Sequence, residues 1–287
     1  MADLRAAWDR YWFEGLPAER LAVFSRIVHL VVLYTVFRTD VVVADKVWAP
    51  AAFYQPTWLA RVLQLPAPTH LTMDVVRVVI LASTLLALAG VGPRRLVNGV
   101  VASSYLVFFL WGFGYAKVDH DQLTIIVSLF VLTAVPGEGR GRDPMVGWAL
   151  RTIQVVFLLA YPLSAVSKLR KSGFGWMSSA VFARAIVRRG SPIGDWFAAQ
   201  PALLRAGQWS FIGFEFAATI ALLPRLRLRN VVLGGIVLLH LFTWLAIGIS
   251  FLPHTICITA FMPLERLHPS RWRLRARVRP GEEQVRA

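Results

Sequence analysis

Long apolar segments dominate this chain and restrict its fold more than any other feature. Of its 287 residues, 56% are hydrophobic and only 16% are Asp, Glu, Lys or Arg, whereas soluble globular proteins carry more charge. The apolar residues fall in blocks of about the length that a helix needs to cross ~30 Å of hydrocarbon. Because that layer holds no water, backbone groups must be satisfied within the segment, which favours helices. The sequence therefore predicts an all-α, polytopic membrane helix bundle.

We expect about eight transmembrane helices in one domain that covers residues 21–265. Hydropathy and the positions of Gly, Pro and charged residues place the spans at about 21–37, 75–91 and 96–113, then one that ends at Pro136, then about 146–166, 209–223, 231–249 and 252–263. The fourth and the eighth are short for a full crossing. Residues 1–20 read as an interfacial amphipathic helix with Trp8, Tyr11 and Trp12 on one side, and residues 266–287 as a basic tail.

Basic residues predict the orientation of the bundle, because cytoplasmic loops are enriched in Lys and Arg. A cytoplasmic N-terminus also places three basic clusters and the tail inside; the clusters are Arg94 and Arg95, Arg140 and Arg142, and Arg225, Arg227 and Arg229. Both termini are then cytoplasmic. The net charge of +15 is read as contact with anionic membrane lipid and not with nucleic acid. Abundant Ala, Val and Arg with few Lys suggest a GC-rich bacterial genome. The expected location of the multi-pass chain is then the bacterial inner membrane.

One segment opposes this orientation. Residues 167–208 are basic but would face outward. Loop charge alone does not decide between two interpretations. The segment either contacts lipid headgroups or caps an active site that handles an anion.

Ionisable residues within a bilayer are costly, so each needs a partner or a function. Arg26 and His29 lie three residues apart in the first span, which places them on one helix face, and we interpret them as a structural intramembrane pair. Glu215 in the sixth span could pair with either. For Glu215 and for His240 in the seventh span, a site and a structural role stay open.

A second polar group is predicted at the outer boundary. Lys168 closes the fifth span, Asp119 and His120 open the fourth, and His254 opens the eighth. Desolvation penalises the ammonium form of a lysine at an apolar boundary, which makes the neutral amine available as a base. The alternative for Lys168 is that its side chain extends to the lipid headgroups.

Other chemistries find little support. A single cysteine, Cys257, excludes an intrachain disulfide and a thiolate zinc site. The histidines lack the short spacing of metal ligands, so we expect no metal. Phosphate-binding and nucleophile-elbow motifs are missing.

Several stretches match the motifs of a known family. They are Leu-Ala-Val-Phe-Ser-Arg-Ile at 21–27, Asp-His-Asp-Gln-Leu at 119–123, Tyr-Pro-Leu-Ser-Ala-Val-Ser-Lys-Leu at 161–169 followed by Gly175 and Trp176, and then Glu215, Arg225, Arg227 and His240. Together they resemble the horizontally transferred transmembrane (HTTM) family, whose best-known relatives are the vitamin K-dependent γ-glutamyl carboxylases. The Lys-Leu…Trp stretch and the upstream histidine are the most specific part.

The resemblance implies a chemistry. Lys168 matches the catalytic lysine that acts as base toward vitamin K hydroquinone, and His120 matches an assisting catalytic histidine. The substrate or quinone pocket would include Asp119, Glu215, His240, His254 and Trp176. The implied function is a membrane lyase or oxygenase that oxygenates a vitamin K or menaquinol-type quinol, alone or coupled to carboxylation of a small or peptide substrate.

Departures from the family narrow that implication. The carboxylases carry a large soluble β-rich part after the membrane domain, whereas this chain runs only about twenty residues past its last predicted helix. The family glycine before the lysine is replaced by Ala165, or by Ser167 in a shifted alignment. Propeptide-directed carboxylation is therefore not expected.

Two further functions stay open. A non-enzymatic membrane partner or export and maturation helper for a secreted peptide would co-purify with another protein and tolerate loss of Lys168. A small-molecule transporter would show inverted repeats, and no internal repeat is evident in the sequence.

Overall fold

The computed structural model describes residues 2–38, 47–115, 118, 120–135 and 141–269. These residues form helices and the turns between them, apart from one short antiparallel pairing of β1 (Leu16–Pro17) with β2 (Arg142–Asp143). Five helices are long and apolar enough to cross a membrane: α2 (Ala18–Arg38), α4 (His70–Ala89), α5 (Arg94–Tyr115), α7 (Pro144–Ser172) and α11 (Leu226–Ile247). The all-α class is confirmed, and the five helices are consistent with a multi-pass membrane protein.

Shorter helices stand where three of the eight spans were predicted. The fourth corresponds to α6 (Leu123–Ala134), the sixth to α10 (Pro201–Ala217) with η5 (Ala218–Leu222), and the eighth to α12 (Leu252–Thr255) with η6 (Ile256–Phe261). The remaining helical elements are α1 (Ala2–Trp12), η2 (Ala51–Phe53), α3 (Trp58–Val62), η3 (His120–Gln122), η4 (Phe174–Ser178), α8 (Val181–Arg189), α9 (Pro192–Ala198) and η7 (Leu264–Leu267). The number of spans therefore stays a prediction beyond these five helices.

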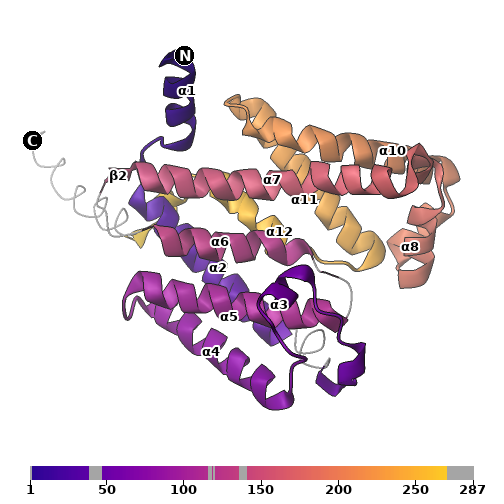
Figure 1. Cartoon of the computed structure of the whole chain (residues 1–287). Helices are drawn as coiled ribbons and strands as arrows, with labels where there is room; N and C mark the ends of the chain where they lie inside the picture. Colours follow the sequence, from indigo (N-terminus) through magenta and orange to yellow (C-terminus); the bar gives the residue numbers. More distant parts are fainter. Residues whose placement is uncertain (1, 39–46, 116–117, 119, 136–140, 270–287) are drawn as a thin grey trace, which may run out of the picture. The chain divides into compact units, whose positions relative to one another are not determined.

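The chain divides into two compact units, of which the first comprises residues 1–153 and 259–287. Its α4 and α5 form a helical hairpin (Figure 1). Thr69 and Thr72 form a capping box at the start of α4, and Gly90 ends the helix in a left-handed conformation with φ of 70°, which glycine adopts without steric cost. Asn98 of α5 donates to the carbonyl of Leu132 in α6 at 3.2 Å.

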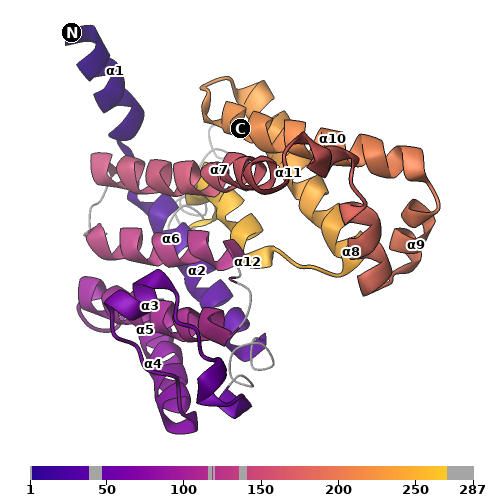
Figure 2. The same cartoon turned by 45° about the vertical axis from the view of Figure 1, so that its right-hand side comes forward.

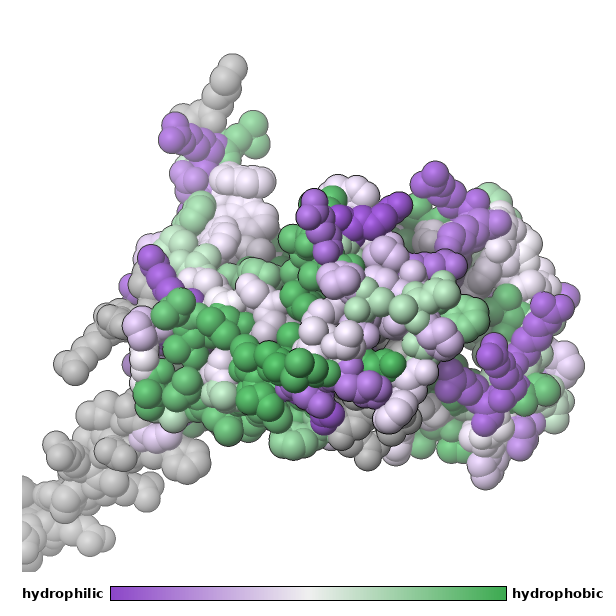
Figure 3. Space-filling view, turned by 60° about the horizontal axis from the view of Figure 1, so that its bottom comes forward, coloured by the Kyte–Doolittle hydropathy of each residue, from purple (hydrophilic) through white to green (hydrophobic). Residues whose placement is uncertain are grey.

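The outer face of α4 is apolar. Leu71 is 73% exposed and Val78 is 64% exposed. Figure 3 shows apolar side chains over the part of the surface where α4 lies in Figure 1. A soluble monomer rarely exposes such an area, but lipid covers it at no cost, which agrees with a membrane location.

The N-terminal segment differs from the single helix predicted over residues 1–20. Helix α1 ends at Trp12, and α2 begins at Ala18. Between them Leu16 and Pro17 pair with Asp143 and Arg142. Proline lacks a backbone N–H, so it interrupts a helix but is tolerated just before one.

We expect Gly147→Ala to destabilise this unit by about 1–3 kcal/mol. A Cβ at position 147 of α7 would lie well within van der Waals contact of the Glu14 carbonyl oxygen, and a backbone oxygen cannot rotate away as a side chain can. Thermal unfolding in detergent measures the effect. Gly213→Ala is the matched control, because a Cβ there meets no atom within 4 Å; equal losses in both variants would contradict the prediction.

The second unit comprises residues 154–258. It contains helices where the sequence predicts a long polar segment at 167–208. Helix α7 continues to Ser172, and η4, α8, α9 and the start of α10 follow (Figure 2). Glycines at 173 and 190 end α7 and α8, and the Ser191 hydroxyl caps α9 by accepting from the Gly194 N–H at 2.8 Å. Hydropathy does not predict helices here because α8 and α9 have only 9 and 7 residues.

Candidate functional site

Helix α7 supplies one stripe of the candidate site, all of it within the second unit. Phe157, Tyr161, Ser164 and Lys168 are spaced by four, three and four residues along the helix. With 3.6 residues per turn, this spacing places all four on one helix face. Their partners come from η4, α10, α11 and α12 of the same unit.

Lys168 and Glu215 form an ion pair at the end of this stripe. The Lys168 ammonium donates to Glu215 Oε1 at 2.5 Å and to Ser164 Oγ at 2.7 Å. The Glu215 side chain is only 4% exposed and that of Lys168 is 22% exposed. A carboxylate this deeply buried is tolerable only beside an opposite charge. Lys168 therefore takes the place of Arg26 or His29, the partners that the sequence suggested for Glu215.

Two aromatic rings lie close to the same ammonium. Lys168 Nζ is 4.7 Å from the ring centroid of Phe211 and 5.5 Å from that of Trp176. Both distances are within the range of a cation–π interaction. The Gln208 side-chain amide donates to the Trp176 carbonyl at 2.8 Å, which holds η4 against α10.

Helix α10 contributes three side chains to the site, and their spacing also follows the helical repeat. Gln208, Phe211 and Glu215 are spaced by three and four residues and so lie on one helix face. The three residues contact the Trp176 backbone, the Trp176 ring and the Lys168 ammonium, respectively. One face of α10 therefore organises both the ion pair and its aromatic surroundings.

Tyr161 links two histidines about two helical turns before Lys168. Its hydroxyl lies 2.8 Å from His240 Nε2 of α11 and 3.2 Å from His254 Nε2 of α12. A phenol has one hydrogen to donate, so it donates to one ring and accepts from the other. The two histidines must then differ in tautomer, with the Nε2 hydrogen on only one of them while both are neutral.

Apolar rings enclose these histidines. The His254 ring stacks on Phe157 with centroids 4.5 Å apart, and the His240 ring lies 5.0 Å from that of Phe251. His254 is buried. The hydrogen-bonded chain of His240, Tyr161 and His254 is thus shielded by aromatic side chains, which strengthens its hydrogen bonds relative to those in water.

No family model matches the chain, and neither does a curated protein or a solved structure. The likeness to HTTM proteins therefore stays a hypothesis carried by the residues quoted above.

The structure brings five of the predicted site residues into one unit: Lys168, Glu215, Trp176, His240 and His254. His120 lies exposed in η3 of the first unit, so its role beside Lys168 stays a prediction. Asp119 lies outside the described residues.

The predicted pair of Arg26 and His29 occupies two different environments. His29 is buried, and its Nδ1 lies 2.7 Å from the Ser25 carbonyl oxygen one turn earlier. Arg26 is exposed. A three-residue step leaves two side chains about 60° apart around the helix axis, and the boundary of the buried face falls between these two.

Sequence reasoning did not single out Tyr161, Ser164 and Phe211 as site residues. Their signal was present in the spacing of polar residues along 157–168 and of aromatic and polar residues along 208–215. In the part of the chain that the structure describes, no group of three or more His, Cys, Asp or Glu side chains is placed to hold a metal ion.

Proposed function

We propose that this chain is a multi-pass membrane enzyme that acts on a quinol, with Lys168 as its base. The observation that carries the proposal is an ion pair between the partly buried Lys168 and the buried Glu215, bordered by two aromatic rings. In its neutral form, a lysine held this way accepts a proton, and the aromatic rings beside it favour binding of a ligand with an apolar ring. The resemblance to HTTM proteins supports the same lysine.

The pair suits proton transfer because it can exist in two charge states. With one proton fewer, a neutral Lys168 amine lies beside the Glu215 carboxylate. Lys168 then accepts a hydroxyl proton from the quinol and becomes the ammonium that Glu215 and Ser164 stabilise. The Lys168 side chain is 22% exposed, so the pair is not sealed off from a ligand.

The residues fit an aromatic, weakly polar ligand. Trp176 and Phe211 offer ring faces, and Met177, Ile212 and Leu169 surround them with apolar surface. Molecular oxygen is the oxidant. It either takes two electrons and two protons from the quinol, giving the quinone and hydrogen peroxide, or adds one oxygen atom to the ring, giving the quinone epoxide and water. The proposal also includes His120 as an assisting residue. It places the chain in a bacterial inner membrane, with eight spans and both termini in the cytoplasm.

Quinone binding tests this proposal directly. We expect menaquinone, added at low concentration to the purified chain in nanodiscs, to quench tryptophan fluorescence, and we expect this quenching to saturate. Trp176→Leu, which removes the ring, should weaken binding up to about tenfold, since an aromatic pair contributes about 0.5–1.5 kcal/mol beyond its buried area. Trp58→Leu is the matched control, because Trp58 is exposed in the first unit. A wild-type chain that binds no quinone would overturn the proposal.

A further inference from the structure

A cavity in the first unit has no role in the chemistry above. It has a volume of about 300 Å³ and lies between α2, the end of α4 and the start of α5. Residues 90–93 form the turn between the two helices of the hairpin. Since α4 and α5 both have the length and composition of membrane spans, this turn must lie at the depth of the lipid headgroups.

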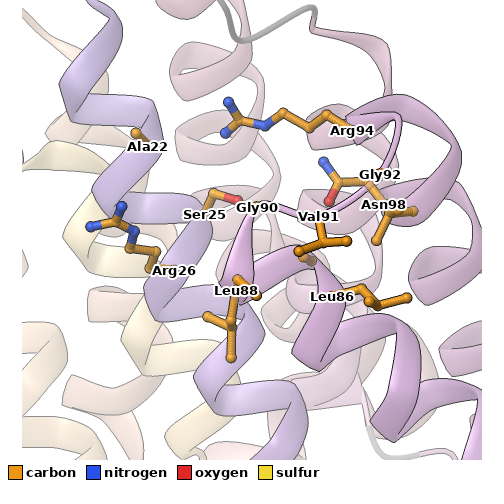
Figure 4. A pocket seen from close by; sticks show the side chains of 13 residues that line it. Ala22, Ser25, Arg26, Leu86, Leu88, Gly90, Val91, Gly92, Arg94 and Asn98 are labelled. Carbon is orange, nitrogen blue, oxygen red and sulfur yellow. The ribbon is translucent and has the colours of Figure 1, made fainter.

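The cavity is lined by two kinds of surface. Figure 4 shows Arg94 reaching from α5 toward α2, with Ser25 and Asn98 on the same side. Leu86, Leu88 and Val91 lie on the other side. The cavity thus has one polar, basic wall and one apolar wall.

The charge of the lining is positive. Arg26 and Arg94 both line the cavity, and Asp and Glu do not occur among the described residues that line it. A guanidinium presents several N–H donors in a planar fork that matches the oxygens of a phosphate group. The Ser25 hydroxyl adds a further donor on the same wall.

We propose that this cavity binds a phosphate group, with Arg94 as its main ligand. The apolar wall favours a phosphate carried by an anionic phospholipid, whose glycerol and first acyl carbons would lie against Leu88 and Val91. Basic pockets between membrane helices bind such headgroups on the cytoplasmic side. Free phosphate shares the recognised group, and the experiment separates the two sources.

The test measures lipid that stays bound to the purified full chain. The protein is extracted from nanodiscs of phosphatidylcholine with an equal part of phosphatidylglycerol, and its bound lipid is identified by native mass spectrometry. We expect phosphatidylglycerol to be enriched over phosphatidylcholine, and Arg94→Gln to reduce that enrichment about tenfold, the effect of losing a charge-assisted contact. Arg95→Gln is the matched control, since Arg95 is exposed and does not line the cavity.

A second variant keeps the proposal testable if Arg94→Gln fails to fold. Val91→Trp places a large side chain on the apolar wall, at an exposed turn position, and so fills the cavity beside that wall. Both arginines stay in place, and the enrichment of phosphatidylglycerol should again be lost. In a further measurement, the unfolding temperature of the wild-type chain is followed with either inorganic phosphate or phosphatidylglycerol added. Stabilisation by the lipid alone identifies a lipid site, and equal stabilisation by inorganic phosphate identifies a free-phosphate site. Stabilisation by neither, or an equal loss of enrichment in Arg95→Gln, overturns the proposal.

Discussion

A chain in which Lys168 is replaced by Met should turn over a quinol about a hundredfold more slowly than the wild type, or worse, the usual contribution of a positioned acid–base group. Methionine keeps the length and apolar stem of lysine but cannot accept a proton. The measurement is aerobic conversion of menaquinol to oxidised or epoxidised product by purified protein in nanodiscs, followed by chromatography and mass spectrometry.

Loss of activity in that variant has a second possible origin, which is unfolding. Removing one member of a buried ion pair leaves the other charge uncompensated, at a cost of about 3–5 kcal/mol. Glu215, with a side chain only 4% exposed, would be such an orphan. The double variant Lys168→Met with Glu215→Leu removes both charges, and we expect it to regain most of the lost stability while it stays inactive.

The matched control for Lys168 is Lys171→Met. Lys171 lies on the same helix but is exposed, so its loss should leave both turnover and unfolding unchanged. A double variant that folds and turns over quinol at the wild-type rate would remove Lys168 from the mechanism. The same result, together with stable co-purification of another protein, would favour the non-enzymatic helper function.

Tyr161→Phe should lower the free energy of unfolding by about 1–3 kcal/mol, the cost of leaving buried polar groups without their partner. The substitution removes only one oxygen, yet His240 and His254 both lose their contact with it. The variant keeps the ring that packs on Phe157, with centroids 5.8 Å apart. Thermal and denaturant unfolding in detergent measure the change.

Tyr34→Phe provides the control for Tyr161, since Tyr34 of α2 is exposed and the same oxygen is removed there at little cost. The variants His240→Leu and Tyr161→Phe, alone and together, form a double-mutant cycle that isolates their coupling. Losses that add without coupling would show that the hydrogen-bonded chain does not act as a unit. Equal stability of Tyr161→Phe and the wild type would contradict the prediction outright.

Long apolar runs made the fold class predictable. Spans such as α4 and α5 contain enough consecutive apolar residues for hydropathy alone to find them, and Gly92 and Pro93 mark the break between them. For residues 167–208 the sequence predicts a long polar segment, whereas the structure forms several helices there. Helices such as α8 and α9 are too short for a hydropathy window and depend on contacts within their unit.

Single residues of the candidate site were predictable, but their partners were not. Lys168, Glu215 and His240 stood out because a charge or imidazole in an apolar run requires an explanation. Lys168 and Glu215 are 47 residues apart, and Tyr161 and His240 are 79 apart. No local spacing rule connects residues at such separations.

The sequence by itself determined that the chain is helical and apolar enough for a membrane, and which of its side chains are too polar to be buried alone. These properties follow from local composition, because a charge or an unpaired backbone group is costly to bury in any apolar environment. Only the tertiary structure decided that Glu215 meets Lys168, that Tyr161 joins two histidines, and that Arg94 lines a cavity. Pairing depends on which faces of distant helices pack together, and that is set by the whole core at once.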